Sequence, residues 1–379
     1  MFWRNATLAF TAVALTLVLI ELALRIAIGK PSFKLVNWRT ENVMKGRIGD
    51  LNGVADPVLG WTLKPWSANG DYRRIDHGIR PNSIETVVRD GAVLAVGDSF
   101  TEGWEVDNDE TWPAYLEKLA AVPVVNAGVG GYGVDQIALR AEQLLPILKP
   151  KILIVGIHEA SIGRTGYSIH GVPKPHFTLE EGQLRYHPPE RFEPPQPTIP
   201  SLGDRIREVL GYSAAVDYLM SRLEPNYWYS IGSQWIYRKV AVDESAVTCA
   251  LLKQLKARTE TEGVRLLLFM QYYAINIVGD HRPRNSPRVI ACAEAANIRV
   301  VDHFDSLRAI EGPKQNAPKQ NAMAEFYYMH GGLFGHMTAK GNEHAATLLA
   351  RALRDWLPLI KDSWPAGQPP PVSDWAGAK

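Results

Sequence analysis

The sequence is poor in cysteine and has no excess of charge of either sign. Its 379 residues include 2 cysteines, Cys249 and Cys292, which have no metal-ligand spacing and are too few for a disulfide framework, although they are free to pair. The 41 Lys and Arg residues balance the 40 Asp and Glu residues, and no long basic run occurs. A nucleic-acid-binding protein normally has a basic face or stripe, so we expect no nucleic-acid partner.

Ligand sets for metals and phosphates are missing as well. His158, His170 and His176 lack the spacing of a zinc site, and the loop around Ser99 lacks the lysine and the glycine spacing of a P-loop. We therefore expect no metal and no cofactor. The same absence argues against a non-catalytic flavodoxin-like module that binds a phosphate through a Gly-rich loop.

The N-terminal segment differs in kind from the rest of the chain. No charge interrupts the run between Arg4 and Glu21, and apolar residues continue to Ile28 with only Arg25 among them. A helix needs about 20 residues to span the hydrocarbon core, so the span is adequate if Glu21 and Arg25 pair at i, i+4 near the interface. No small-x-small cleavage site follows, which favours an uncleaved signal anchor over a removed signal peptide. We expect residues 1–30 to be a single-pass anchor in the cell inner membrane, with the remaining chain extracytoplasmic (periplasmic).

The rest of the chain divides by its patterning. Residues 31–89 are punctuated by Gly, Pro and Asn, which predicts a linker that packs on the following domain. In residues 90–362 apolar strands alternate with helical patterns, which is typical of an α/β domain with a parallel sheet and helices on both faces. Prolines crowd residues 165–200, so we expect loops inserted over one side of this domain. The Pro-rich tail, 363–379, is expected to be disordered.

Five strands and five helices are expected in the α/β region and the segment it encloses. The strands are Ala92–Val96, Val124–Asn126, Ile152–Ile157, Val264–Met270 and Ile298–Val301, and the helices are Thr111–Leu119, Val134–Leu145, Leu202–Leu223, Glu244–Thr261 and Ala345–Leu357.

A serine stands where the first buried strand gives way to a turn, in the segment Gly97–Gly103. Ligands of open α/β sheets gather beyond the carboxyl ends of the strands, and Ser99 there would have an exposed hydroxyl beside free backbone N–H groups. A plain strand-to-loop turn is the alternative. Asp98 is better suited to an Asx-type turn than to the role of a catalytic acid.

Two later blocks give Ser99 plausible companions. The Gly-rich segment Asn126–Gly133 follows the second strand, and its backbone N–H groups can face a developing oxyanion, although a flexible turn is the alternative. His336 precedes the C-terminal helix and can return to the serine loop as a general base. The nearest competing imidazole is His330.

These blocks together resemble the SGNH (GDSL-type) hydrolase family over roughly residues 55–360. The N-terminal anchor, the Leu59–Trp61 unit and the Phe100–Val106 segment resemble, more narrowly, membrane-anchored bacterial members related to polysaccharide O-acetyltransferases and deacetylases. The resemblance implies a flavodoxin-like, three-layer α/β/α fold. It also implies ester chemistry, with Ser99 as nucleophile, His336 as base, and the N–H groups of Ser99 and Gly131 in the oxyanion hole.

The third strand departs from the family pattern, in which a Gly-x-Asn-Asp context supplies a further oxyanion donor. His158 stands at the Asn position if Gly156 is aligned, and Ala160 does if the register slips. An imidazole N–H of His158 would replace the missing donor, whereas Ala160 would leave it absent. Loss of one such donor costs about 3 kcal/mol of transition-state stabilisation.

The acid of the family pattern is also missing, because Leu333 and Phe334 stand where an Asp normally precedes the catalytic His. Candidate substitutes are Asp302, Asp305 and Glu325. A backbone carbonyl holding the imidazole, and thus a Ser-His dyad, is the alternative.

The leading hypothesis is a serine esterase or O-acyltransferase that acts on an acylated glycan or a similar ester through an acyl-enzyme on Ser99. Hydrolase and transferase are not distinguished, because they differ only in what attacks that intermediate. The alternative hypothesis is a catalytically weakened SGNH-fold protein that binds polysaccharide or scaffolds an envelope assembly, and the missing Asn and Asp favour it.

Overall fold

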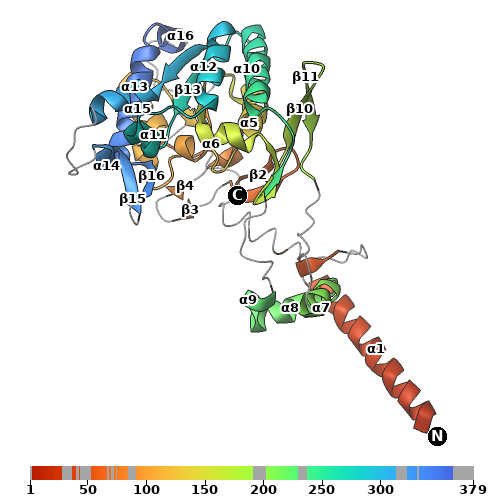
Figure 1. Cartoon of the computed structure of the whole chain (residues 1–379). Helices are drawn as coiled ribbons and strands as arrows, with labels where there is room; N and C mark the ends of the chain where they lie inside the picture. Colours follow the sequence, from red (N-terminus) through yellow and green to blue (C-terminus); the bar gives the residue numbers. More distant parts are fainter. Residues whose placement is uncertain are drawn as a thin grey trace. The chain divides into compact units, whose positions relative to one another are not determined.

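The computed structural model describes residues 2–27, 36–39, 42, 53–65, 68–69, 72–73, 75–83, 91–190, 202–228, 237–312, 322–330 and 333–361. Contacts group the chain into two units (Figure 1). The smaller unit comprises Met1–Asp50 and Arg191–Ile236, and the larger comprises Leu51–Glu190 and Tyr237–Lys379. Residues 191–236, which lie inside the expected 90–362 domain, thus group with the N-terminal segment. The tail 363–379 lies outside the described residues.

The larger unit is built on a parallel sheet of five strands in the order β14-β13-β7-β5-β6. This confirms the predicted α/β class. Every residue of β5, β6 and β7 is buried, as expected of strands covered on both faces. The five strands are β5 (Val93–Val96), β6 (Val124–Asn126), β7 (Ile152–His158), β13 (Arg265–Gln271) and β14 (Arg299–Asp302).

The strand order reverses direction at β5. The chain leaves β5 for β6 at one edge, then returns past β5 to β7 and continues to β13 and β14. Because crossovers between parallel strands are right-handed, this reversal assigns α4 to one face and α5, α10 and α12 to the other. The contacts agree, since α4 packs with α15 while α10 packs with both α5 and α12. In open α/β sheets, such a switch point is where ligands bind.

Three of the four helices predicted in the larger unit, α4, α5 and α10, begin within one residue and end within three residues of the expected limits. The last long helix starts at Ala339, before the expected Ala345, because the Thr338 hydroxyl accepts a hydrogen bond from Gly341 N at 3.3 Å and caps it. The helices are α3 (Ser99–Glu102), α4 (Trp112–Ala120), α5 (Val134–Leu148), α6 (Glu159–Arg164), α10 (Glu244–Thr261), α11 (Ala274–Gly279), α12 (Asn285–Ala295), α13 (His303–Glu311), α14 (Met323–Phe326), α15 (Ala339–Ala352) and α16 (Pro358–Lys361).

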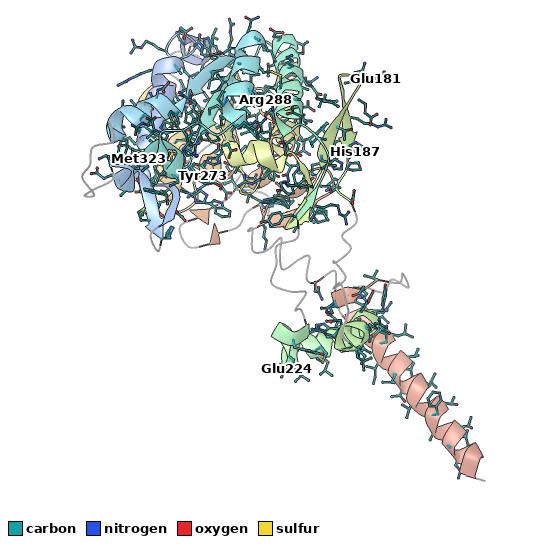
Figure 2. All side chains as sticks on the ribbon, in the orientation of Figure 1. Glu181, His187, Glu224, Tyr273, Arg288 and Met323 are labelled. Atoms are coloured by element: carbon teal, nitrogen blue, oxygen red, sulfur yellow. A yellow bond between two sulfur atoms is a disulfide. The ribbon has the colours of Figure 1, made fainter. Side chains whose placement is uncertain are left out.

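The Pro-rich segment 165–200 is not a set of loops, and this prediction is wrong for its first part. Its described residues form strands β8 (Tyr167–His170), β9 (Val172–Pro173), β10 (His176–Glu180) and β11 (Gln183–His187), and β12 (Tyr237–Lys239) pairs with β8. Glu181 and Gly182 link β10 to β11 with φ of 52° and 81°, values typical of a tight hairpin turn (Figure 2 labels Glu181). Pro173 ends a short strand, where a missing N–H costs little. Residues 191–200 lie outside the described part.

A fully buried ion pair attaches this hairpin region to the helix after the Gly-rich loop. Lys174 Nζ donates to Asp135 Oδ2, to the Tyr167 carbonyl at 3.1 Å and to the Pro175 carbonyl at 2.8 Å. Because the ammonium and the carboxylate have no access to water, removing either would leave an uncompensated buried charge.

The described residues of the 53–83 region pack on the sheet domain. They form two small hairpins, β1 (Gly53–Asp56) with β2 (Gly60–Leu63) and β3 (Ala68–Asn69) with β4 (Tyr72–Arg73), followed by a 3-10 turn at Asp76–Gly78. Trp61 is fully buried, and the Leu59 carbonyl accepts a hydrogen bond from Gln136 Nε2 at 2.8 Å. Leu59 and Trp61 thus lie against the start of α5.

The smaller unit contains helices α1 (Phe2–Ala27), α7 (Leu202–Leu210), α8 (Ala214–Leu223) and α9 (Pro225–Trp228). Among the described residues, the stretch Asn5–Ala27 of α1 is the one helical segment long and apolar enough to cross a membrane, with a mean hydropathy of 2.2 and none of it buried. The predicted pair forms, with Arg25 Nε 2.7 Å from Glu21 Oε1.

The two cysteines form a disulfide between α10 and α12, with their Cα atoms 6.0 Å apart. Cys249 lies on α10 and Cys292 on α12, and the two helices pack together on one face of the sheet. This pairing, left open by the sequence, links the two helices that flank β13.

Candidate active site

Ser99 and His336 meet although they lie far apart in the sequence. Ser99 is the first residue of α3, directly after the turn that leaves β5, and His336 lies on strand β16 (Leu333–Met337), which pairs with β15 (Tyr327–His330). The Ser99 Oγ atom and the His336 Nε2 atom are 3.0 Å apart. This distance suits proton transfer from a serine hydroxyl to an imidazole. Ser99 is only 5 % exposed.

The competing imidazole contacts a different group. His330 Nε2 is 3.0 Å from Glu105 Oε1. Of the two histidines on this hairpin, His336 is therefore the one at the serine hydroxyl.

None of the three carboxylates predicted as the acid contacts the His336 ring in the described part of the chain, so this prediction is corrected. Asp302 and Asp305 pair with Arg282 at 3.1 and 2.7 Å, and Glu325 pairs with Lys340. The reason is topological: β14, which ends at Asp302 and is followed by Asp305, is separated from β5 by β13 and β7. At the usual strand spacing this is about 14 Å across the sheet.

Glu105 is the carboxylate nearest to the position of the orienting acid, for which the sequence pattern showed no Asp. Its Oε2 atom accepts a hydrogen bond from the His336 backbone N–H at 3.1 Å, and its Oε1 atom lies 3.7 Å from His336 Nδ1. Glu105 belongs to the Phe100–Val106 segment that carries part of the family resemblance, but its contact partner lies 231 positions away. The one sequence feature that could have pointed to Glu105 as the orienting acid is that it is a carboxylate inside this segment.

The backbone at Glu105 is held in an uncommon conformation. Its φ of 70° lies in the left-handed region, which non-glycine residues rarely adopt and which occurs disproportionately at functional sites. The guanidinium of Arg80 holds the surrounding loop, since it donates to the carbonyls of Glu102 at 2.9 Å, Val106 at 2.6 Å and Gly103. The loop that presents Glu105 is thereby fixed on both sides of this residue.

The protonation states of this pair suit a base and its orienting acid. Burial lowers the pKa of His336, although the charges of Glu105 and Asp98 act in the opposite direction, so the imidazole is neutral at neutral pH. Burial by itself raises the pKa of Glu105, but hydrogen bonds from His330 and from the His336 N–H, together with the two imidazoles, lower it overall. An ionised carboxylate thus faces a neutral imidazole.

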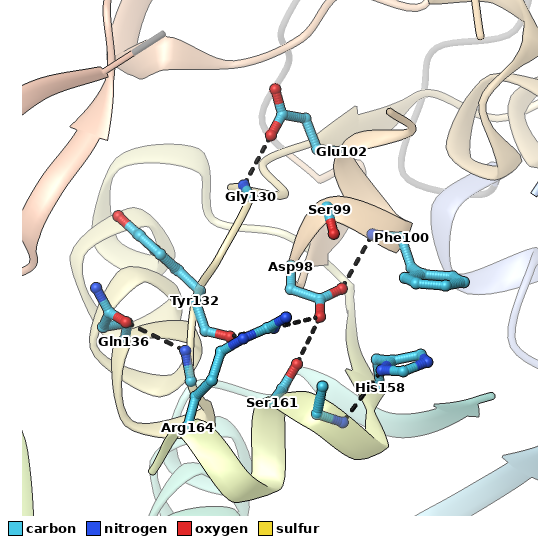
Figure 3. Close-up of polar contacts among 12 residues, drawn as sticks. Asp98, Ser99, Phe100, Glu102, Gly130, Tyr132, Gln136, His158, Ser161 and Arg164 are labelled. Atoms are coloured by element: carbon cyan, nitrogen blue, oxygen red, sulfur yellow. Dashed lines mark hydrogen bonds and ion pairs between the residues drawn. The ribbon is translucent and has the colours of Figure 1, made fainter. Parts of the chain in front are cut away.

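Two backbone N–H groups predicted for the oxyanion hole are available. Within the described residues, neither the Ser99 N–H nor the Gly131 N–H has a hydrogen-bond acceptor, whereas Phe100 N donates to Asp98 Oδ1 at 3.0 Å and Gly130 N donates to Glu102 Oε2 at 2.7 Å (Figure 3). Gly131 has a φ of 79°, which a residue with a side chain would rarely adopt. The two donors follow neighbouring strands, β5 and β6.

The loop that carries Gly131 is fixed from several directions. The fully buried Glu102 carboxylate accepts from Gly130 N and from Trp104 Nε1 at 2.9 Å. Trp61 Nε1 donates to the Gly130 carbonyl at 3.3 Å, and Tyr132 Oη donates to the Trp61 carbonyl at 2.5 Å. The Leu59–Trp61 unit, recognised in the sequence without a role, therefore supports this loop.

Asp98 stabilises the nucleophile turn, as predicted. Besides the Phe100 N–H, its carboxylate accepts from Ser161 Oγ at 2.7 Å and from Arg164 Nη1 at 3.0 Å (Figure 3). Burial would raise the pKa of Asp98, but the Arg164 charge and these hydrogen bonds lower it. Arg164 also donates to the Tyr132 carbonyl at 3.2 Å, so it links the serine turn to the Gly-rich loop.

His158 has a free imidazole donor in the described structure. Its Nδ1 atom accepts from the Ala160 N–H at 3.1 Å, and burial lowers the pKa of His158 to about 3, so the ring is neutral with its proton on Nε2. That Nε2 atom is buried without a hydrogen-bond partner among the residues described. The ring stacks on Phe100, with centroids 4.3 Å apart, and contacts Tyr273, which precedes α11 and is labelled in Figure 2. Ala160 lies within α6 and has no donor side chain.

Comparison with known proteins yields structural neighbours only, since no protein-family model and no curated protein matches the chain. An acetylxylan esterase from Geobacillus stearothermophilus is 15 % identical, covers 72 % of this chain and 95 % of its own, and has a TM-score of 0.37. A lipase/acylhydrolase from Enterococcus faecalis is 13 % identical, with coverage of 70 % and 96 % and a TM-score of 0.37. An alpha/beta hydrolase from the metagenome of Lake Arreo is 14 % identical, with coverage of 70 % and 95 % and a TM-score of 0.40.

Proposed function

We propose that this protein is a serine-dependent ester-processing enzyme with an SGNH-type, flavodoxin-like three-layer α/β/α fold. The observation that carries the proposal is the 3.0 Å contact between Ser99 Oγ and a neutral His336 Nε2, with the ionised Glu105 carboxylate at Nδ1 of the same ring. Nucleophile, base and orienting acid in this order are the arrangement that activates a serine.

The chemistry proceeds in two acyl transfers. Ser99 Oγ attacks the ester carbonyl carbon while His336 Nε2 takes its proton, and the resulting oxyanion accepts hydrogen bonds from the N–H groups of Ser99 and Gly131. His336 then gives that proton to the leaving alcohol as the carbon–oxygen bond breaks, which leaves an acyl-enzyme. A water molecule or an acceptor hydroxyl then attacks this ester while His336 Nε2 takes its proton, and His336 returns the proton to Ser99 Oγ as the bond between the acyl group and Ser99 breaks. We assign His158 Nε2–H as a third donor in place of the usual Asn amide.

Glu105 acts on His336 rather than on the substrate. In the resting protein its Oε1 atom is 3.7 Å from Nδ1, beyond a normal hydrogen bond, and catalytic contacts of this kind commonly tighten when the imidazolium forms. The His336 backbone N–H donates to the Glu105 carboxylate, and this hydrogen bond keeps the carboxylate beside the imidazole that it orients.

The substrate that we propose is an acylated glycan or a similar ester, and the location is the periplasmic side of the inner membrane. The substrate follows from the sequence resemblance to enzymes of polysaccharide acylation. The location follows from the apolar helix α1 as an uncleaved single-pass anchor, and the Cys249–Cys292 disulfide suits an oxidising compartment outside the cytoplasm.

The alternative, a weakened SGNH-fold protein that binds polysaccharide or scaffolds an envelope assembly, rested on the missing Asn and Asp. Glu105 supplies a carboxylate and His158 a donor, so the specific argument for inactivity is weaker than the sequence suggested.

The test is covalent labelling of the full-length protein in detergent. We expect a serine-directed phosphonate to label the parent protein and a chromogenic acetyl ester to be hydrolysed, and both to be lost in Ser99→Ala and strongly reduced in His336→Ala. Ser221→Ala, which removes a hydroxyl from α8, is the matched control and should behave like the parent. A parent protein that shows neither labelling nor turnover would instead favour the binding alternative.

A further inference from the structure

Helix α7 of the smaller unit has an apolar face whose residues are exposed in the described part of the chain. We propose that α7 lies in the surface of the bilayer crossed by α1, with this face in contact with lipid. The inference rests on the membrane-anchoring part of the proposed function and adds a second membrane contact to it.

Helix α7 is amphipathic, with its apolar side chains on one face. Leu202, Ile206, Val209 and Leu210 recur at the spacing of one helical face and all are exposed, with Leu202 at 75 % and Val209 at 70 %. No described residue of this helix is buried. A helix in water without a buried face has little to stabilise it, since most helical stability comes from packing of an amphipathic face.

The charges on the opposite side indicate how α7 meets a membrane. Asp204, Arg205, Arg207 and Glu208 carry no net charge, so the helix does not depend on anionic headgroups. A helix with one apolar face and a charged opposite face lies on a membrane, whereas one that is apolar all round spans it. In the smaller unit, α7 is a helix of the first kind and α1 is one of the second.

Contacts place the α7–α8 junction at the end of the apolar stretch of α1 (Figure 1). Glu21, the residue that ends the uncharged run, accepts hydrogen bonds from Ala214 N and Ala215 N at 2.9 Å and from Ser213 Oγ at 2.8 Å. The carboxylate thereby caps α8 at its N-terminus. The spanning helix α1 therefore contacts the N-terminus of α8 at the point where α1 becomes polar. This point marks the level of the membrane interface.

The surroundings of the junction have the composition of an interface. Tyr212, Tyr218 and Tyr227 are exposed there, and tyrosine is enriched at headgroup level in membrane proteins. The guanidinium of Arg207 lies 4.4 Å from the Tyr227 ring centroid and that of Arg222 lies 3.5 Å from the Tyr218 ring centroid. Leu219 and Leu223 of α8 add exposed apolar area at i, i+4 spacing.

The test uses the full-length protein reconstituted in phosphatidylcholine–phosphatidylglycerol vesicles, with one new cysteine at a time labelled by a fluorophore sensitive to polarity. The native cysteines are paired with each other and do not compete. Ile206→Cys and Val209→Cys report on the apolar face of α7, Glu208→Cys on the opposite face as the matched control, and Val13→Cys on α1. Ester turnover of each variant checks that the catalytic unit is folded.

We expect lipids carrying a doxyl quencher to reduce the fluorescence at positions 206 and 209 at least threefold more than at 208, with strong quenching at position 13. Quenching at 13 with no difference between 206 and 208 would overturn the surface contact, and cross-linking between 206 positions would then identify a second copy as the occupant. Quenching at 206 and 209 without quenching at 13 would support the surface contact and refute the anchor. Quenching at none of them would refute both.

Discussion

The two sides of the proposed active site are built differently. On the serine side, Asp98 and Glu102 are fully buried, and each accepts hydrogen bonds that link the nucleophile turn to the Gly-rich loop. On the histidine side, the Glu105 side chain is 31 % exposed and His330 is 61 % exposed, and His336 Nδ1 has no hydrogen-bond partner among the described residues.

Because of this difference, substitutions on the two sides should differ in their effects on stability and on activity. A buried ionic network is costly to disrupt, because a remaining charge cannot be solvated, so changes on the serine side should affect stability and activity together. On the histidine side the groups are partly solvated, so changes there should affect activity with little effect on stability.

Replacing the buried carboxylate of the serine side should have the largest effect. Asp98→Ala leaves the Arg164 guanidinium without a carboxylate partner and removes the cap of α3. We expect a loss of about 3–5 kcal/mol in the free energy of unfolding together with loss of turnover. Urea denaturation and ester hydrolysis measure the two effects. Asp305→Ala, which removes an exposed carboxylate paired with Arg282, is the control and should change neither.

Glu105→Ala should reduce activity with little change in stability. Without the orienting carboxylate the imidazole loses its productive tautomer and its partner for the imidazolium, and kcat should fall about 10³- to 10⁴-fold, while the urea midpoint stays close to that of the parent. The measurement is steady-state hydrolysis of an acetyl ester. Glu325→Ala is the matched control, because Glu325 pairs with Lys340. A Glu105→Ala variant with parental kcat would favour a Ser-His dyad.

Gly131→Ala should impair the oxyanion donor more than the fold. A β-carbon at a φ of 79° costs roughly 1–3 kcal/mol, and displacement of the N–H should reduce kcat about 10²-fold. Gly182→Ala provides a matched control, since Gly182 has a φ of 81° in the β10–β11 turn and no atom within 4 Å of an added β-carbon. The two variants should lose similar stability, and only Gly131→Ala should lose turnover. Equal kcat values would exclude Gly131 from the oxyanion hole.

The smallest expected effect is on the pH profile. His336 must be neutral to act as a base, and burial places its pKa below the ordinary value of 6.5, so kcat/KM should fall as the pH drops through that lowered value. The Glu105 charge raises the pKa of His336, so in Glu105→Gln the acid limb should move to a lower pH. The residual activity of that variant, followed between pH 4 and 8, gives the measurement, and a shift toward higher pH would contradict this role of Glu105.

Much of the sheet and half of the site could be predicted because their signals are local. Strand Val124–Asn126 has the predicted limits, and Ile152–Ile157 differs from β7 by one residue. Ser99 and Gly131 follow such strands directly, so a parallel sheet brings them to one edge. The prolines of 165–200 misled the prediction because a proline at a strand end is compatible with short, edge-type strands.

The α/β class, the five strands of the parallel sheet, the apolar helix and the turn that carries Ser99 could be predicted from the chain alone, because periodicity and turn chemistry depend on neighbouring residues. The family resemblance added the roles of His336 and Gly131. Only the tertiary structure decided that Glu105 lies beside His336, that Cys249 pairs with Cys292, and that Glu21 caps α8. Each of these contacts joins residues far apart in the chain. They depend on the order of strands and the packing of helices, and no local pattern encodes that arrangement.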